Sequence, residues 1–161
     1  MAANYFLKFT PDVPGEASQT GYEKQIEILS FSWGVSQAGG FSYAGGGGVA
    51  QANVQDLSVS FRQNKSSPKL MEACASGKHF DEVMLTCLRA AGDKAEKYLE
   101  ITLTDVIVSS YQTGGSGDDF PIESMSLNFA KIKEEFFEQD DKGVGKSAGV
   151  GQWDQAKAST K

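Results

Sequence analysis

The stretch 99-LEITLTDVIV-108 alternates apolar and polar residues and then loses its phase. From Leu99 to Leu103 an apolar residue occupies every second position, which is the repeat of a β-strand with one buried face. After Asp105 the apolar residues shift by one position and resume at Val106. We therefore expect a long strand that has either a β-bulge near Asp105 or two covered faces.

The same alternation recurs along the chain and predicts a mainly β protein. Further strands are expected around residues 5–9, 29–35, 57–61, 83–87 and 125–129. In the second of these, the residues expected to face the core are Leu29, Phe31, Trp33 and Val35. Many short strands separated by polar, glycine-containing turns favour a sandwich or a closed barrel.

One segment, between residues 65 and 79, breaks the β pattern. Ser67 suits a helix N-cap, Pro68 suits the first helical position, and Gly77 suits the position just past the C-terminus. The sequence predicts one short helix over about residues 68–76. The side chains expected to pack on the core are those of Leu70, Met71 and Cys74.

Charge and hydropathy exclude several classes of partner. The chain has 161 residues, enough for one domain with a sizeable core, and a net charge of −6. This acidic balance disfavours binding to nucleic-acid phosphates. No apolar run approaches the roughly 20 residues of a membrane-spanning helix, so we expect no membrane insertion. The N-terminus lacks the features of a classical signal peptide, so we expect synthesis in the cytoplasm.

Four consecutive glycines at positions 45–48 raise the question of a cofactor. Residues 45–50 match the loose dinucleotide fingerprint GxGxxA, which works only where a helix begins directly after it. A strand pattern follows here, so no cofactor is expected. The alternative is an extended glycine-rich loop, over about residues 38–52, whose tip can lie close to another backbone.

Catalysis and metal binding have few candidate residues. His79 is the only histidine, so a Cys-His nucleophile would have to use it, with Cys74 five residues earlier. The ordinary interpretation is a core thiol and an imidazole at a helix end. One histidine and two separated cysteines do not supply the ligands of a metal site. We expect no enzyme and no metal, and a Cys-His hydrolase and a monomeric β-barrel that binds a small ligand stay as alternatives.

Small hydroxyl residues occupy the strand positions opposite the predicted core. They are Ser30, Ser32, Ser36, Ser58, Ser60, Ser124 and Ser126. A sheet face of this kind is hydrated and offers hydrogen bonds without large apolar patches. It is either an ordinary solvent-exposed face, the lining of a wide wet cavity, or a seam between subunits.

Short motifs follow one another in a fixed order along the chain. They are Phe31-Ser32-Trp33-Gly34, Gly45-Gly46-Gly47-Gly48, Val54-Gln55-Asp56-Leu57, Ser67-Pro68-Lys69-Leu70-Met71, Ser76-Gly77-Lys78-His79 and Leu127-Asn128-Phe129-Ala130. Together they resemble the Hcp family, the haemolysin co-regulated proteins that form the tube of type VI secretion. The resemblance extends to about residue 137.

This resemblance implies a β-barrel of two packed antiparallel sheets with one short α-helix, spanning residues 1–137. The Gly- and Lys-rich tail, residues 138–161, is less distinctive, and we expect it to be either flexible or ordered only on assembly, when Trp153 finds a pocket. The resemblance also implies a homohexameric ring, stacked rings, a VgrG-type spike, a contractile sheath, and small effector proteins carried in the lumen. The protein would be cytoplasmic during assembly and then secreted from a Gram-negative cell by the type VI apparatus.

Two sets of site residues follow from the resemblance. Ser32, with Ser30 beside it, is expected to line the lumen and contact cargo. The glycine-rich loop is expected to reach a neighbouring subunit or the next ring. Its contact residues would be Phe41, Tyr43, Gly45, Gly46, Gly47, Gly48 and Gln51.

Overall fold

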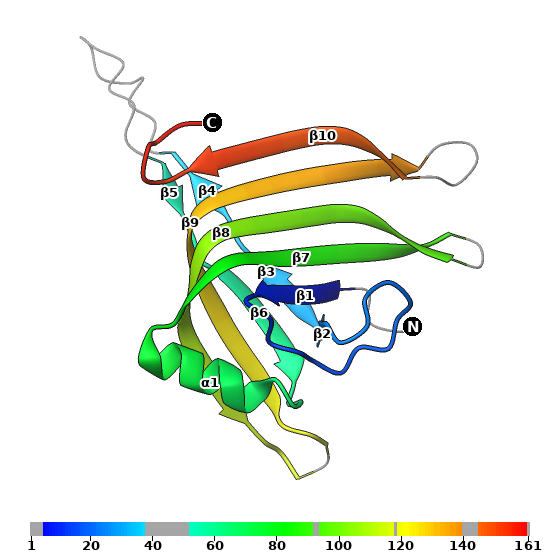
Figure 1. Ribbon diagram of the computed structural model, residues 1–161, viewed down its shortest axis with the longest axis vertical. Helices are drawn as coiled ribbons and strands as arrows, with labels where there is room; N and C mark the ends of the chain where they lie inside the picture. The colour runs from blue at the N-terminus through cyan, green and yellow to red at the C-terminus, as the bar shows by residue number, and fades with distance from the viewer. Residues whose placement is uncertain (1–4, 38–51, 92–93, 118, 140–144, 161) are drawn as a thin grey trace.

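The computed structural model describes residues 5–37, 52–91, 94–117, 119–139 and 145–160. They form a mainly β structure with one helix, as predicted (Figure 1). The elements are β1 (Tyr5–Thr10), β2 (Ile26–Ile28), β3 (Ser30–Ser32), β4 (Val35–Ser36), β5 (Asn53–Val54), β6 (Leu57–Arg62), α1 (Ser67–Ser76), β7 (His79–Ala91), β8 (Lys94–Gly114), β9 (Ile122–Gln139) and β10 (Gly145–Asp154).

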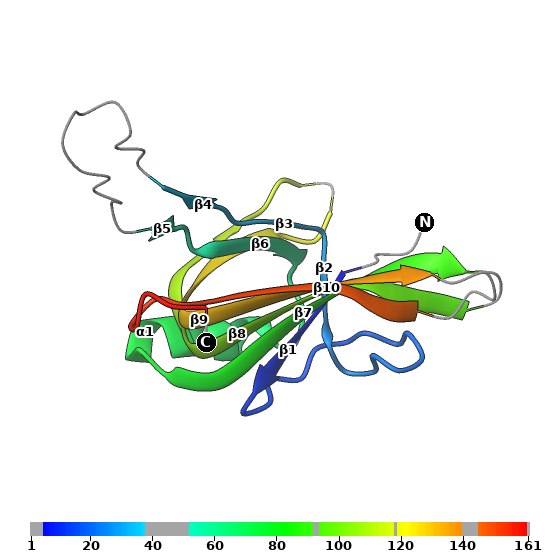
Figure 2. The same cartoon turned by 90° about the horizontal axis from the view of Figure 1, so that it is seen from above.

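All strands except β4 and β5 form one antiparallel sheet that curls into a nearly closed barrel (Figures 1 and 2). Its order is β2-β1-β7-β8-β9-β6-β3, and β10 also pairs with β9. Strand β9 has β8 along one edge, while its other edge pairs first with β6 and then with β10. The strands β4 and β5 form a separate two-stranded ladder.

In β7, β8 and β9 the buried side chains switch between odd-numbered and even-numbered positions at one level of the sheet. The buried residues on either side of the change are Phe80 and Val83 in β7, Leu103 and Val106 in β8, and Phe129 and Ile132 in β9. At this level Asp105 is exposed and takes a left-handed backbone conformation, with φ of 55°. The sheet therefore turns a corner across three strands, and both halves of each strand face one core.

The register of β8 stays unchanged on the two sides of Asp105. Thr104 and Val106 are both paired with β7 and β9 in the same register. The register shift expected near Asp105 lies further along β8, between Val108 and Ser110. The sequence thus located the break in alternation correctly; the left-handed Asp105 lies there in β8, and β7 and β9 change their buried positions at the same level.

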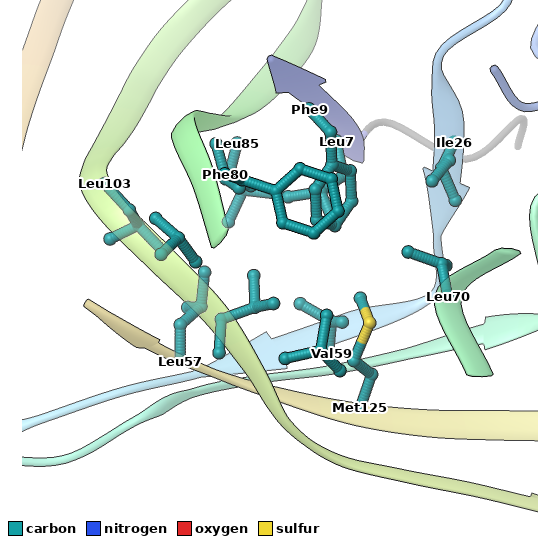
Figure 3. Packing of buried hydrophobic residues seen from close by; sticks show 14 of the residues in the cluster. Leu7, Phe9, Ile26, Leu57, Val59, Leu70, Phe80, Leu85, Leu103 and Met125 are labelled. Atoms are coloured by element: carbon teal, nitrogen blue, oxygen red, sulfur yellow. The ribbon is translucent and has the colours of Figure 1, made fainter. Parts of the chain in front are cut away.

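The core lies between two layers of this curled sheet (Figure 3). Side chains of β1 and β7 face side chains of β6 and β9, and Leu70 of α1 packs beside them. The labelled residues are Leu7, Phe9, Ile26, Leu57, Val59, Leu70, Phe80, Leu85, Leu103 and Met125. The predicted core positions in strands 57–61, 83–87 and 125–129 are all buried.

Helix α1 begins at Ser67 and ends at Ser76, which confirms the predicted segment. The predicted N-cap is wrong, because Ser66 holds that position, without a side-chain capping hydrogen bond, and Ser67 is the first helical residue. Gly77 caps it in a left-handed conformation, with φ of 67°. The predicted burial of Met71 is wrong, since its side chain is 51% exposed and Ala73 is buried instead. Each residue turns a helix by about 100°, so the position after Leu70 points away from the core.

The predicted strand 29–35 is interrupted, and two of its four core residues are wrong. Leu29 is 44% exposed and Val35 is 58% exposed, whereas Phe31 and Trp33 are half-buried against the core. Strand β2 pairs with β1, but β3 pairs with β6. Leu29 lies where the chain crosses between these two layers, so the alternation is broken there.

The C-terminal segment joins the sheet within the single chain. The expected boundary after residue 137 falls inside β9, and β10 pairs with residues 131–139 of that strand. Trp153 packs against the core, and Asp154 is buried. The Asp154 carboxylate accepts hydrogen bonds from the backbone N–H groups of Ala156 and Lys157, at 3.0 and 3.2 Å.

The left-handed residue gives a prediction for stability. Asp105→Val should lower the free energy of unfolding by about 1–2 kcal/mol, because β-branched residues strongly disfavour positive φ. Asp105→Gly should keep the stability near that of the wild type, because glycine adopts this conformation freely. Urea unfolding of both variants measures the difference, with Glu27→Val, at an exposed acidic residue of β2, as the control. Equal stabilities of the valine and glycine variants would contradict the proposed role of the turn.

Candidate functional site

A continuous face of serine side chains covers the sheet where β3, β6, β9 and β8 lie side by side. Directly paired residues of neighbouring strands point to the same face. We define the serine face as Ser30, Ser32, Ser58, Ser60, Ser109, Ser110, Ser124 and Ser126. One row joins Ser32, Ser58 and Ser126, and the next joins Ser30, Ser60 and Ser124.

The core determines where these hydroxyl groups point. Leu57 and Val59 of β6 are buried, and so are Met125 and Leu127 of β9. The residues between them must lie on the opposite face, because successive strand residues alternate. Ser30 and Ser32, the two predicted lumen residues, are both exposed on this outer face.

The serine hydroxyls bind one another across the strands. The Oγ atoms of Ser30 and Ser60 are 2.5 Å apart. Ser126 Oγ lies 2.5 Å from Ser110 Oγ and 2.7 Å from Ser109 Oγ. Five of the eight serines are thus hydrogen-bonded to another serine of the face, as one pair and one group of three.

This layer ends at one carboxylate, Asp56, which precedes β6. Ser109 donates its hydroxyl to Asp56 Oδ2 at 2.7 Å, and Asn128 Nδ2 donates to Oδ1 at 2.9 Å. Since a hydroxyl has one hydrogen, Ser126 must donate to Ser109, and Ser110 must donate to Ser126. The hydroxyl hydrogens of Ser110, Ser126 and Ser109 are thus directed along this chain of hydrogen bonds toward Asp56. Lone pairs of the hydroxyl oxygens are left to accept hydrogen bonds from a partner.

The second set of predicted site residues lies outside the described residues. It comprises Phe41, Tyr43, Gly45, Gly46, Gly47, Gly48 and Gln51. The described residues on either side of this segment belong to the β4–β5 ladder, in which Val35 pairs with Val54. The two flanks of the segment therefore lie on adjacent strands.

The alternative Cys-His site has an ordinary structural setting. Cys74 is half-buried in α1 and packs against the core, while His79 is exposed at the start of β7. In the part of the chain that the structure describes, no group of three or more His, Cys, Asp or Glu residues could hold a metal ion. Within the same residues, no helix has the length and apolarity to cross a membrane.

Sequence reasoning missed Asp56, Ser109 and Asn128 as part of the site. The alternation marks Asp56 only as the polar neighbour of Leu57, and Asn128 only as one more outward residue of β9. Their meeting depends on the register of three strands, which period-2 patterns do not determine. The only available signal was that the outward positions carry hydroxyl and amide groups throughout.

Comparisons with known proteins agree with this fold. The family model described as "Type VI secretion system effector, Hcp" matches residues 6–136. The protein hcp1 of Pseudomonas aeruginosa is 44% identical over 145 residues, which are 89% of each chain. A solved structure of a type six secretion system protein has a TM-score of 0.89 at 28% identity and covers 99% of this chain and 100% of its own.

Hcp1 from Salmonella typhimurium has a TM-score of 0.78 at 29% identity, with 98% of each chain covered. These similarities, spread over the whole barrel, define a tube protein of type VI secretion. The chain belongs to the Hcp family.

Proposed function

We propose that six copies of this tube protein close into a ring and that the rings stack to form the secretion tube. The observation that carries the proposal is the family match across residues 6–136, supported by near-complete coverage of Hcp structures. Ring closure requires two different complementary surfaces on each copy, because head-to-tail contacts close only around a rotation axis. The tube would carry a VgrG-type spike, lie inside a contractile sheath, and leave the cytoplasm through the type VI apparatus.

The serine face is the surface that we assign to the lumen. It is broad, hydrated and hydrogen-bonded within itself, so it does not require an apolar partner to cover it. Small effector proteins would bind there through many weak hydrogen bonds, in which Ser30 and Ser32 take part. Repetition around a ring would then convert weak contacts into useful affinity.

The segment 38–52 is the surface that we assign to contacts between copies. It carries no charged residue, and its glycines allow close approach of another backbone. The β4–β5 ladder holds both flanks of this segment together. A contact with the neighbouring subunit or the next ring would use Phe41, Tyr43, Gly45, Gly46, Gly47, Gly48 and Gln51.

The ring has a direct test. Size-exclusion chromatography with light scattering should give about six times the chain mass of 17.3 kDa. Electron micrographs of the same fractions should show annular end views. A monomer at micromolar concentration would instead support the small-ligand binding module and overturn the ring.

The lumen assignment predicts a cargo defect without loss of the ring. Ser32→Gln places a longer side chain on the serine face and should lower effector accumulation on co-expression several-fold. The change per subunit is about 0.5–1.5 kcal/mol and is multiplied by avidity. Ser18→Gln, at an exposed position in the loop between β1 and β2, is the matched control. Unchanged cargo in a Ser32→Gln ring would exclude the lumen role of Ser32.

The contact assignment predicts an assembly defect without unfolding. Gly46→Trp with Gly47→Trp should shift light-scattering masses toward smaller species, because the bulky rings prevent close backbone approach. Circular dichroism should show the wild-type fold. Gly117→Trp is the control, since a side chain at that exposed glycine meets open space. Normal rings and tubes from the double variant would refute the contact.

A further inference from the structure

Glu123 is a completely buried carboxyl group near the start of β9. Its side chain is 0% exposed, and its neighbours in the sheet are Phe61 of β6 and Thr113 of β8. One oxygen, Oε1, accepts a hydrogen bond from the Ser67 hydroxyl. The other oxygen, Oε2, is buried without a hydrogen-bond partner. A buried unpartnered oxygen is costly when the group is charged.

This carboxyl group connects the first turn of helix α1 to the barrel. Ser67 Oγ, which donates to Glu123, also accepts the backbone N–H of Asn64 at 3.0 Å. Asn64 Oδ1 in turn accepts the backbone N–H of Ser66 at 2.9 Å, and its Nδ2 donates to the carbonyl of Arg62 at 2.9 Å. The hydrogen bond from Ser67 to Glu123 therefore ties the turn from β6 to α1 and the helix start to β9, in addition to the packing of Leu70 in the core.

The charged groups of the packed elements lie at the surface. They are Arg62 of β6, Lys65 in the turn, Lys69 and Glu72 of α1, and Asp119 of the β8–β9 hairpin. Arg62 forms an ion pair with Asp119, in which Nη1 and Oδ2 are 3.6 Å apart. Thr113, the neighbour of Glu123 in β8, is uncharged. Burial raises the pKa of Glu123, and the Ser67 hydrogen bond opposes this by lowering it. The positive end of the helix dipole also favours the ionised form.

The same turn forms one wall of an open groove. The groove has a volume of about 940 Å³, and its lining includes Arg62, Gln63, Asn64 and Lys65 as well as Phe120 of the hairpin. Gln63 N–H donates to the carbonyl of Pro121 at 3.0 Å, so the hairpin is attached to the turn. A change in the hydrogen bond between Ser67 and Glu123 would thus affect both the helix and this groove.

We propose that Glu123 is a proton-controlled link between helix α1 and the barrel. When the carboxyl group is protonated, the link holds the first helical turn and the preceding turn against β9. When it is ionised, Ser67 still donates to it, but an unpaired charge lies in the core, and opening of the helix start relieves the cost of burying that charge. All of these contacts lie within one chain, so the inference is independent of ring formation.

The direction of the pH effect follows from the raised pKa of the folded state. A carboxyl group of this kind contributes stability that is fully present below its unfolded pKa, near the ordinary value of 4.5. That stability is lost as the pH rises through the folded pKa. Attachment of α1 should therefore weaken on going from acid toward neutral and alkaline pH.

Amide hydrogen exchange of residues 67–77 tests the link in the full chain. Between about pH 5 and pH 8, wild-type protection, corrected for intrinsic exchange rates, should fall several-fold. In Glu123→Gln it should stay constant, because the neutral amide does not titrate. Glu72→Gln, at an exposed glutamate of the same helix, should follow the wild type. A wild-type protection that is independent of pH, or the same slope in Glu123→Gln, would overturn the proposal.

A direct titration serves as the second measurement and does not depend on a variant that folds. Carbon-13 NMR of the glutamate side chains of the wild-type chain should show one carboxyl group that titrates above the others. Its assignment to Glu123 comes from the loss of that resonance in Glu123→Gln, or from contacts with Ser67. Titration of Glu123 at or below the ordinary value of a glutamate would overturn the proposal.

Discussion

Strand β9 pairs with β8 along one edge and with two different strands along the other, and the barrel depends on this arrangement. Residues 122–127 of β9 pair with β6, whereas residues 131–139 pair with β10. Between these ranges β7, β8 and β9 all change the parity of their buried positions, at the level of the left-handed Asp105. A straight strand that kept one parity would direct half of these apolar side chains to solvent, so the corner lets one ladder enclose one core.

The outer face is a consequence of the same register. Once Leu57, Val59, Met125 and Leu127 are buried, the serines between them must form rows across β3, β6 and β9. The register shift after Val108 adds a second serine to the row in β8, so that Ser126 contacts two hydroxyls. Packing and the candidate site are therefore determined together, and a one-residue slip would place the serines in the core.

The sequence predicts structural features that lie within one strand or helix, and it misses those that depend on which strands pair. The alternation in residues 57–61 and 125–129 predicted buried and exposed faces correctly, and Pro68 and Gly77 located the helix. The prediction for Leu29 was wrong because the chain changes its pairing partner there, from β1 to β6. No local sequence pattern indicates such a change. The C-terminal strand was missed because its glycine-rich stretch has no apolar alternation and is held by β9. The Asp56 network was missed because it joins residues from three strands.

The two buried carboxyl groups of the described chain, Glu123 and Asp154, differ in their hydrogen-bond partners. Asp154 accepts two backbone N–H bonds, and its Oδ2 lies 3.8 Å from Lys131 Nζ. These contacts fasten the C-terminal segment to the barrel. Glu123 has one hydroxyl donor and an unpartnered oxygen, so its burial is compatible with the neutral acid and costly for the anion. The C-terminal segment is thus attached through a buried acid with several partners, whereas the helix start is attached through a buried acid with only one.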